Sequence, residues 1–219
     1  MIEKLLPPPI ATAEAFEDRP LDEMFPEERA AVARAVPSRQ REFGTVRACA
    51  RAALATFGVP PAPLVPGADR APRWPEGLVG AMTHCTGYRA AAIARSTDVR
   101  SVGLDAEPNE PVRDPGVLGL ITLPEERAAL PALQAAQPEI HWDRLIFSAK
   151  ESVYKAWYPL TGRWLGFEDA VLTLDPTDAS FTARLLVEGP EIDGQRLTTF
   201  HGGWLVADGL VVTAVTVER

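Results

Sequence analysis

Apolar positions recur along the chain at two different periods, and each period predicts one kind of element. Between 142 and 158 the apolar residues Leu145, Ala149, Val153 and Ala156 form a stripe at helical spacing, which predicts a helix ended by Pro159. Short apolar and β-branched runs predict strands at 90–94, 102–107, 170–174, 182–187, 204–206 and 210–217. The last two are joined by Ala-Asp-Gly at 207–209, a hairpin signal. We expect an α+β fold with helices segregated from short, mainly antiparallel sheets.

One segment of six residues, Pro-Glu-Glu-Arg-Ala-Ala, occurs at 26–31 and again at 124–129. Proline in the first helical position and acidic residues in the first turn are typical of a helix start. A second correspondence follows in the same order: Phe43, Arg47, Arg51, Ala52 and Gly58 share their mutual spacing with Phe147, Glu151, Lys155, Ala156 and Gly162. We therefore predict two similar halves related by internal duplication, 1–101 and 102–219, each with helices packed on a small sheet, and a ligand site between the halves.

The composition narrows the classes of function. A chain of 219 residues with 46% hydrophobic residues can bury a substantial core, and its net charge of -8 argues against sequence-independent binding of nucleic acid. No apolar run has the length of a membrane span, and the first residues do not have the form of a signal peptide. Cys49 and Cys85 have no metal-ligand spacing, so we interpret them as buried thiols of a cytoplasmic protein that binds no membrane.

Four arginines, Arg39, Arg41, Arg47 and Arg51, are concentrated on one predicted helix of this acidic chain. They form either a local site for an anionic ligand or a solvated helix face, and charge patterning alone leaves both interpretations open.

The run Val-Gly-Leu-Asp-Ala-Glu at 102–107 alternates apolar with small or acidic residues. In a strand, this alternation puts Asp105 and Glu107 on one face. Two carboxylates one pleat apart repel unless a cation lies between them, and magnesium or manganese prefers such ligands. The alternative is a solvated polar strand end. Glu151 and Lys155, one turn apart on the predicted helix, form either an ordinary i,i+4 ion pair or part of a charged face opposite the arginines of the first half.

The segment 102–107 and the segment Phe-Ser-Ala-Lys-Glu-Ser-Val-Tyr-Lys-Ala at 147–156 together resemble the two signature motifs of Sfp-type 4'-phosphopantetheinyl transferases. The arginine-rich run 39–51 and the segment Met-Thr-His-Cys at 82–85 also resemble this family, in particular its enterobactin-synthetase-component-D-like branch from actinobacteria. The resemblance covers roughly residues 37–170. It implies two similar α+β halves with coenzyme A in the cleft between them, and an enzyme that moves 4'-phosphopantetheine from coenzyme A to a serine of acyl or peptidyl carrier protein domains, releasing 3',5'-ADP.

The resemblance also implies roles for individual residues. Asp105, Glu107 and Glu151 would hold a magnesium ion that also binds the pyrophosphate of coenzyme A, with manganese as a substitute. Glu151 would accept the proton of the serine, directly or through water. Lys155 would neutralise or protonate the leaving group and so contact the cofactor as well.

Further residues would bind the phosphates of coenzyme A. The resemblance assigns Arg39 and Arg47 to the 3'-phosphate. It assigns His84 to a phosphate and the neighbouring Thr83 to the cofactor site. Lys150 would bind a further phosphate unless it points to solvent. The family often has a lysine in the loop before the histidine motif. This chain has Arg70 and Arg73 there, and which of them touches coenzyme A is open, as are the contacts of Arg51.

Two other classes of function remain as alternatives: a magnesium-dependent hydrolase of nucleotide diphosphates such as coenzyme A, and a non-catalytic module that binds coenzyme A or a carrier domain. The internal duplication favours a monomer. The sequence does not indicate which carrier domains are served.

Overall fold

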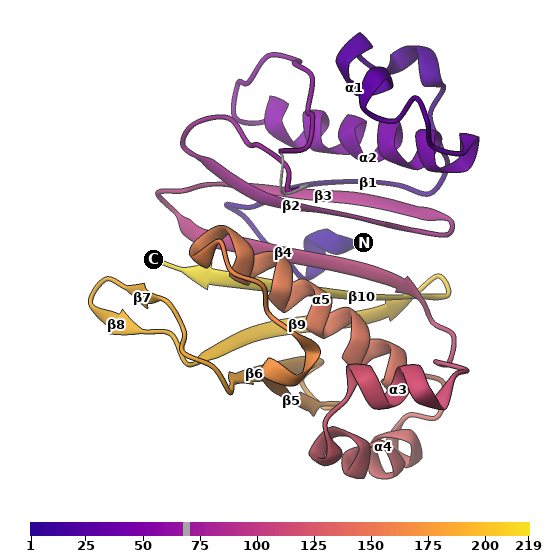
Figure 1. Ribbon diagram of the computed structural model, residues 1–219, viewed down its shortest axis with the longest axis vertical. Helices are drawn as coiled ribbons and strands as arrows, with labels where there is room; N and C mark the ends of the chain where they lie inside the picture. The colour runs from indigo at the N-terminus through magenta and orange to yellow at the C-terminus, as the bar shows by residue number, and fades with distance from the viewer. Residues whose placement is uncertain (68–70) are drawn as a thin grey trace. The chain divides into compact units, whose positions relative to one another are not determined.

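The computed structural model describes residues 1–67 and 71–219, which form two compact units, Met1–Val99 and Arg100–Arg219 (Figure 1). Each unit has its own antiparallel sheet and a long helix packed on that sheet. The expected α+β class with mainly antiparallel sheets is therefore confirmed. Within the described residues, no helix combines the length and the apolar character needed to cross a membrane.

The first unit contains a three-stranded sheet in the order β1-β3-β2. Its elements are η1 (Ile2–Lys4), β1 (Ala11–Ala15), η2 (Leu21–Glu23), α1 (Pro26–Ala31), α2 (Pro37–Ala55), β2 (Leu78–Cys85) and β3 (Tyr88–Arg95). Helix α2 packs on β1 and β3 (Figure 1). The small residues Ala50 and Ala53 of the helix lie in one buried cluster with Ala91 and Ile93 of β3, so helix and sheet can approach closely.

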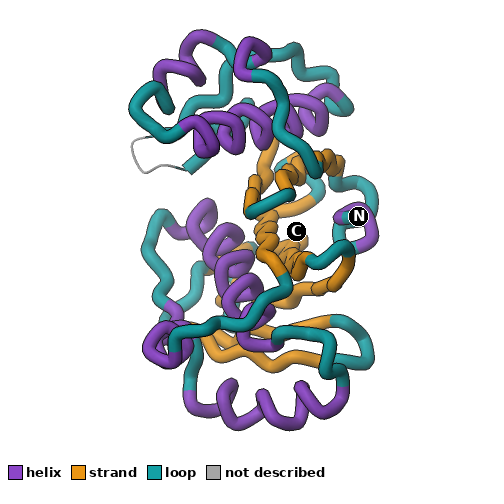
Figure 2. The backbone as a smooth tube through the Cα atoms, turned by 90° about the vertical axis from the view of Figure 1, so that its right-hand side faces the viewer, coloured by secondary structure: helices purple, strands orange, loops and turns teal. Residues whose placement is uncertain are grey.

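The second unit contains a five-stranded sheet in the order β4-β10-β9-β6-β5 and a separate two-stranded hairpin. Its elements are β4 (Val99–Pro108), α3 (Pro115–Ile121), α4 (Pro124–Ala136), α5 (Trp142–Thr161), η3 (Phe167–Asp169), β5 (Ala170–Asp175), β6 (Ser180–Leu185), β7 (Glu191–Ile192), β8 (Gln195–Arg196), β9 (Thr199–Ala207) and β10 (Leu210–Glu218). Helix α5 packs on β10, and Figure 2 distinguishes such helices (purple) from the strands (orange). The rings of Trp142 and Trp204 meet edge to face inside this core, 5.3 Å between centroids.

Several local predictions are confirmed. Both copies of the repeated segment begin a helix, α1 and α4, with proline in the first turn. Helices α2 and α5 end near Gly58 and Gly162, which both have positive φ. Asp208 and Gly209 also have positive φ and form the two-residue turn between β9 and β10, because that turn type requires left-handed residues.

The two units share further features. In each, the first strand pairs with the last one, β1 with β3 and β4 with β10. In each, a helix that starts at the repeated segment precedes the long helix on the sheet. These parallels agree with the predicted internal duplication, which remains a prediction.

Other predictions were wrong or incomplete. Helix α5 does not end at Pro159 but continues to Thr161, where Gly162 donates its N–H to the carbonyl of Tyr158 at 2.8 Å. A proline in the last turn removes a single donor, and the left-handed Gly162 then ends the helix. Strand β1 was missed because three of its five residues are alanine and only Thr12 is β-branched, which gives a weak strand signal. Strand β2, helix α3 and the β7–β8 hairpin were missed as well.

The position of α5 against β4 depends on Gly103. A Cβ atom at this position would lie 1.9 Å from the carbonyl oxygen of Ser152 and 3.0 Å from the backbone nitrogen of Ala156. The side chain of Ser101 donates to the carbonyl of Ala156 at 2.8 Å. The helix backbone therefore lies directly on the strand. This contact brings Glu151 and Lys155 of α5 near the acidic residues of β4.

We expect Gly103→Ala to lower the midpoint of thermal unfolding. The obstacle is the backbone of a buried helix, which cannot move aside as a flexible side chain can, and overpacking of this kind costs about 1–3 kcal/mol or more. Gly119→Ala is the matched control, because its Cβ would meet nothing within 4 Å and alanine favours a helix. Thermal unfolding followed by circular dichroism compares the two, and an unchanged midpoint for Gly103→Ala would contradict the close approach.

Candidate active site

Asp105 and Glu107, the alternate residues after Gly103 on β4, face α5. The ammonium group of Lys155 donates to the carboxylate of Asp105 at 2.8 Å and to the carbonyl of Leu104 at 3.0 Å. Two residues further along β4, Glu107 accepts a hydrogen bond from Arg144 at 3.3 Å. The predicted alternation is thus confirmed, but this face of the strand is covered by a charged helix and is not a solvated strand end. Lys155 reaches across to the strand, which is more than an ordinary i,i+4 pair with Glu151 requires.

Three carboxylates, those of Asp105, Glu107 and Glu151, repel one another electrostatically in this region. The pKa of Glu107 is raised to about 7, first because burial disfavours its charged form and then because Asp105 repels it, while Arg144 opposes the shift. The pKa of Glu151 is raised by burial and next by the charge of Asp105. The side chain of Asp105 is itself buried, with 7% exposed. The structure therefore concentrates negative charge that a bound cation would stabilise.

The donor set fits a hard divalent cation by its chemistry, since carboxylate oxygens are the preferred ligands of magnesium. Among the residues that the structure describes, no group of three acidic, histidine or cysteine side chains is arranged as a ligand shell. One reason is visible in the geometry, because Lys155 pairs with an oxygen of Asp105. Ligation by all three carboxylates would require their side chains to move closer together.

Lys150 lies elsewhere on α5 and does not point to solvent. Its side chain is 4% exposed, and its ammonium group lies 2.9 Å from the carboxylate of Glu126 and 2.7 Å from the carbonyl of Phe167. The predicted contact with a phosphate is untested, and the buried partners of Lys150 do not favour it.

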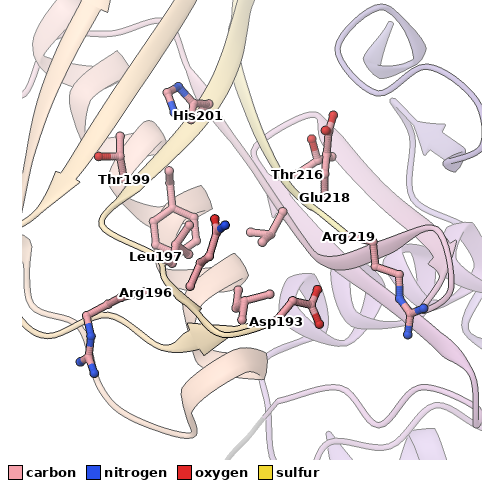
Figure 3. A pocket seen from close by; sticks show the side chains of 12 residues that line it. Asp193, Arg196, Leu197, Thr199, His201, Thr216, Glu218 and Arg219 are labelled. Carbon is pink, nitrogen blue, oxygen red and sulfur yellow. The ribbon is translucent and has the colours of Figure 1, made fainter.

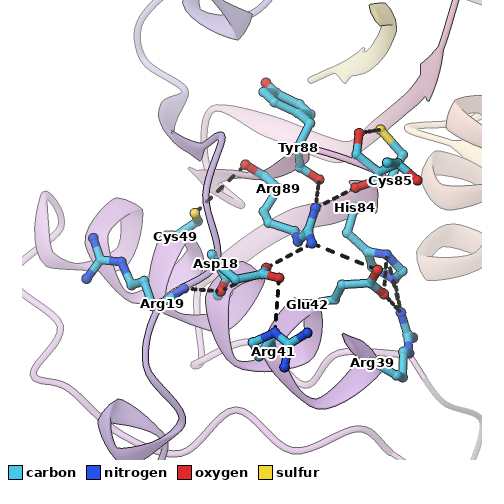
Figure 4. Close-up of polar contacts among 12 residues, drawn as sticks. Asp18, Arg19, Arg39, Arg41, Glu42, Cys49, His84, Cys85, Tyr88 and Arg89 are labelled. Atoms are coloured by element: carbon cyan, nitrogen blue, oxygen red, sulfur yellow. Dashed lines mark hydrogen bonds and ion pairs between the residues drawn. The ribbon is translucent and has the colours of Figure 1, made fainter. Parts of the chain in front are cut away.

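The first unit brings two of the predicted phosphate-binding residues together (Figure 4). The guanidinium group of Arg39 on α2 is in hydrogen-bond contact with the imidazole of His84 on β2. Glu42 lies between them, with its carboxylate 3.4 Å from Arg39 and 3.5 Å from Nδ1 of His84. Both Arg39 and His84 keep part of their side chains exposed, 46% and 31%, so an anion could reach them from solvent.

Arg89 supports this arrangement from the adjacent strand. It stands directly opposite His84 in the β2–β3 register. Its guanidinium group donates to the carbonyls of Cys85 and Tyr88 and forms ion pairs with Asp18 at 2.8 Å and Glu42 at 3.8 Å (Figure 4). The buried arginine therefore ties the hairpin that carries His84 to the helix that carries Arg39.

Arg47 and Arg51 are not part of a solvated helix face. Arg47 is 6% exposed, and its guanidinium group donates to the carbonyl of Leu64 at 2.6 Å and lies over the ring of Phe43. Arg51 pairs with the buried carboxylate of Glu28. The pKa of Arg47 is lowered to about 10, mainly by burial, and the charges of Arg39 and Arg51 lower it further.

The remaining residues singled out in the sequence are placed as follows. Thr83 is buried on β2 beside His84. Cys49 is a buried thiol whose pKa is raised by burial, as expected. The thiol of Cys85, at the end of β2, is only half-buried. Arg73 is exposed, and Arg70 lies outside the described residues.

Two cavities of the second unit differ in their relation to these residues. A cavity of about 740 Å³ lies between the β7–β8 hairpin and the nearby ends of β9 and β10 (Figure 3), and its lining contains none of the predicted site residues. A smaller cavity of about 80 Å³ is lined by Glu151, Tyr154, Trp164 and Phe167, among others. Of these two cavities, only the smaller one is lined by a predicted catalytic residue, Glu151.

Sequence reasoning missed some residues of the site. Arg144 could have been found, since it stands seven residues before Glu151 on the same helix, and this spacing puts both on one face. Arg89 could also have been found, because a charged residue at the start of an alanine-rich strand indicates a buried ion pair. Glu42 gave no signal, because an acidic residue on an arginine-rich helix is usually only a surface neighbour.

Comparison with known proteins agrees with this geometry. The profile of the 4'-phosphopantetheinyl transferase N-terminal domain matches residues 27–94, and that of the 4'-phosphopantetheinyl transferase superfamily matches residues 101–208. The latter range contains the three carboxylates and the whole of α5.

Characterised relatives cover almost the whole chain. The 4'-phosphopantetheinyl transferase Svp of Streptomyces mobaraensis is 58% identical over 220 residues, which is 99% of this chain and 89% of the relative. The 4'-phosphopantetheinyl transferase PptT of Mycobacterium tuberculosis is 50% identical over 94% of this chain and 91% of its own length. The 4'-phosphopantetheinyl transferase Npt of Nocardia iowensis is 45% identical over 98% of this chain and 99% of its own. With these matches over nearly its full length, the chain belongs to the 4'-phosphopantetheinyl transferase family.

Proposed function

We propose that the chain transfers the 4'-phosphopantetheine group of coenzyme A to a serine of acyl or peptidyl carrier protein domains and releases 3',5'-ADP. The observation that carries this proposal is the direct packing of α5 on β4 at Gly103, which brings Asp105, Glu107 and Lys155 together. The chain belongs to a family of 4'-phosphopantetheinyl transferases, and transfer of a phosphorylated group needs charged residues of this kind.

The first unit presents cationic groups that suit a phosphate, and the second presents carboxylates that suit a cation, each beside groups of the opposite charge such as Glu42 and Lys155. Arg39 and Arg47 supply positive charge in the first unit, and His84 is in hydrogen-bond contact with Arg39. We assign these three residues to the 3'-phosphate. Burial is the largest cause of the lowered pKa of Arg47, and a bound anion would favour its charged form, as the charge of Glu28 already does. The carboxylates of the second unit we assign to a divalent cation. The proposal also includes a coenzyme A site formed by both halves, an internal duplication and a monomeric state. The charges described here support the first of these.

Asp105, Glu107 and Glu151 are the residues that would hold magnesium or manganese. When bound, such an ion supplies positive charge to the pyrophosphate oxygens of coenzyme A. The bond from the serine oxygen to the β-phosphorus forms as the bond from that phosphorus to the oxygen of 3',5'-ADP breaks. Glu151 accepts the serine proton, and Lys155 donates hydrogen bonds to the departing phosphate as its charge develops.

Intact-protein mass spectrometry of an apo carrier domain tests the proposal. With coenzyme A and magnesium, we expect the carrier to gain the mass of one phosphopantetheine, and Asp105→Ala or Glu107→Ala to abolish this gain while the variants stay folded by circular dichroism. Free phosphopantetheine with an unmodified carrier would indicate a hydrolase. Binding of coenzyme A with no change in either mass would indicate a non-catalytic module.

The role of Lys155 can be separated from its ion pair with Asp105. We expect Lys155→Met to lower the single-turnover rate of transfer by roughly a hundredfold or more at saturating substrates, and to leave the Michaelis constant for coenzyme A nearly unchanged, because the lysine acts as charge develops on the leaving group. Lys4→Met is the control for loss of a lysine. A near-normal rate for Lys155→Met would reduce Lys155 to a partner of Asp105.

The assignment of the 3'-phosphate is tested with two cofactors. We expect Arg39→Gln and His84→Gln to raise the Michaelis constant for coenzyme A about tenfold or more, and that for 3'-dephospho-coenzyme A much less, because a charge-assisted contact contributes about 1.5–3 kcal/mol. Arg41→Gln is the matched control, since Arg41 lies on the same helix and is also 46% exposed. Equal losses with both cofactors would exclude the contact.

A further inference from the structure

The buried carboxylate of Glu126 joins three elements of the second unit. It accepts the N–H of Leu123 at 2.6 Å, where α4 begins, and the N–H of Leu172 at 2.7 Å, on β5. Its third partner is the ammonium group of Lys150 on α5, at 2.9 Å. Glu126 is only 2% exposed, so every one of these partners is needed to offset the loss of water around its charge.

Lys150 extends this network in turn. Besides Glu126, its ammonium group donates to the carbonyl of Phe167 at 2.7 Å, in the short helix η3. Residues 150 and 151 are neighbours on α5, and consecutive side chains of an α-helix point about 100° apart. When Lys150 is fixed towards α4 and η3, Glu151 is therefore turned towards a different side of the helix.

In the first unit, the glutamate at the same position of the repeated segment makes equivalent contacts. Glu28, the third residue of the first copy, is fully buried and accepts the N–H groups of Phe25 at 3.2 Å and Leu64 at 2.9 Å. Its cation is Arg51 on α2. A buried glutamate that joins its own helix start, the next long helix and a later segment thus occurs twice in the chain, which indicates a function in placing the long helix.

We propose that Glu126 and Lys150 are a positioning pair, which fixes the rotation of α5 about its axis and thereby places Glu151, and that Lys150 makes no contact with coenzyme A. The part that concerns Glu151 rests on the proposed function. The charge coupling between Glu126 and Lys150 is independent of it.

A set of neutral variants tests the pair: Glu126→Gln, Lys150→Gln and the double variant, with Glu125→Gln as a control for an exposed charge in the same helical turn. Each single change leaves a buried charge without its partner, so we expect the midpoint of thermal unfolding to fall by roughly 10 °C. The double variant contains no unpaired charge, and its midpoint should fall by clearly less than the sum of the two. Additive shifts would overturn the pair.

Kinetics of the same proteins, measured well below their unfolding midpoints, test the positioning role. We expect Lys150→Gln to lower the maximal rate roughly tenfold or more, with a Michaelis constant for coenzyme A within about twofold of the original, and the double variant to be faster than either single one. If Lys150 instead binds a phosphate, Lys150→Gln and the double variant will both raise that Michaelis constant about tenfold, which would overturn the proposal.

The outcomes stay distinguishable from failure of the proposed function. If the unsubstituted protein fails to modify any carrier domain, the proposed function fails, while the coupling between Glu126 and Lys150 is still read from thermal unfolding. If Glu126→Gln alone is too unstable to purify, a double variant that folds and unfolds at a normal temperature supports the pair, and one that is equally unstable overturns it.

Discussion

The contact on which the site depends is one between two backbones. At Gly103 the carbonyl of Ser152 occupies the space that any Cβ atom would need. This absence of a side chain lets α5 lie directly on β4, so that the ammonium group of Lys155 reaches Asp105 without a bridging residue. A larger residue would separate the two elements and the charges with them. The glycine is therefore a geometric requirement of the acidic cluster, although it takes no part in the chemistry itself.

Close packing also brings like charges together, which costs electrostatic energy. These charges are negative in the second unit and positive in the first. The second unit crowds carboxylates, and burial with mutual repulsion raises the pKa values of Glu107 and Glu151. The first unit crowds cations, and burial with like charges lowers the pKa of Arg47. Charges held together against repulsion are stabilised by a ligand of the opposite sign. For the carboxylates such a ligand is a divalent cation, and for the arginines it is an anion such as a phosphate.

The sequence predicted elements with a strong local signal and missed what depends on distant contacts. The period of α5, the turn at Asp208 and the two helix starts are set by neighbouring residues, so they could be predicted. The burial of Lys150 could not, because its partner Glu126 is 24 residues away in the chain and looks like an ordinary acidic residue of a first helical turn. The same limitation applies to the partner of Arg89, Asp18, which lies on an irregular segment before α1.

The two buried glutamates show why a chain would retain charged groups in its interior. A buried ion pair adds little net stability compared with apolar residues of the same size, because both charges lose water. Its advantage is directional, since Glu126 is satisfied only when α4, α5 and β5 lie at one particular distance and rotation. Apolar packing would tolerate small rotations of α5, and each would move Glu151 relative to Asp105. A site that needs carboxylates placed around one cation therefore benefits more from a specific ion pair than from a slightly more stable apolar core.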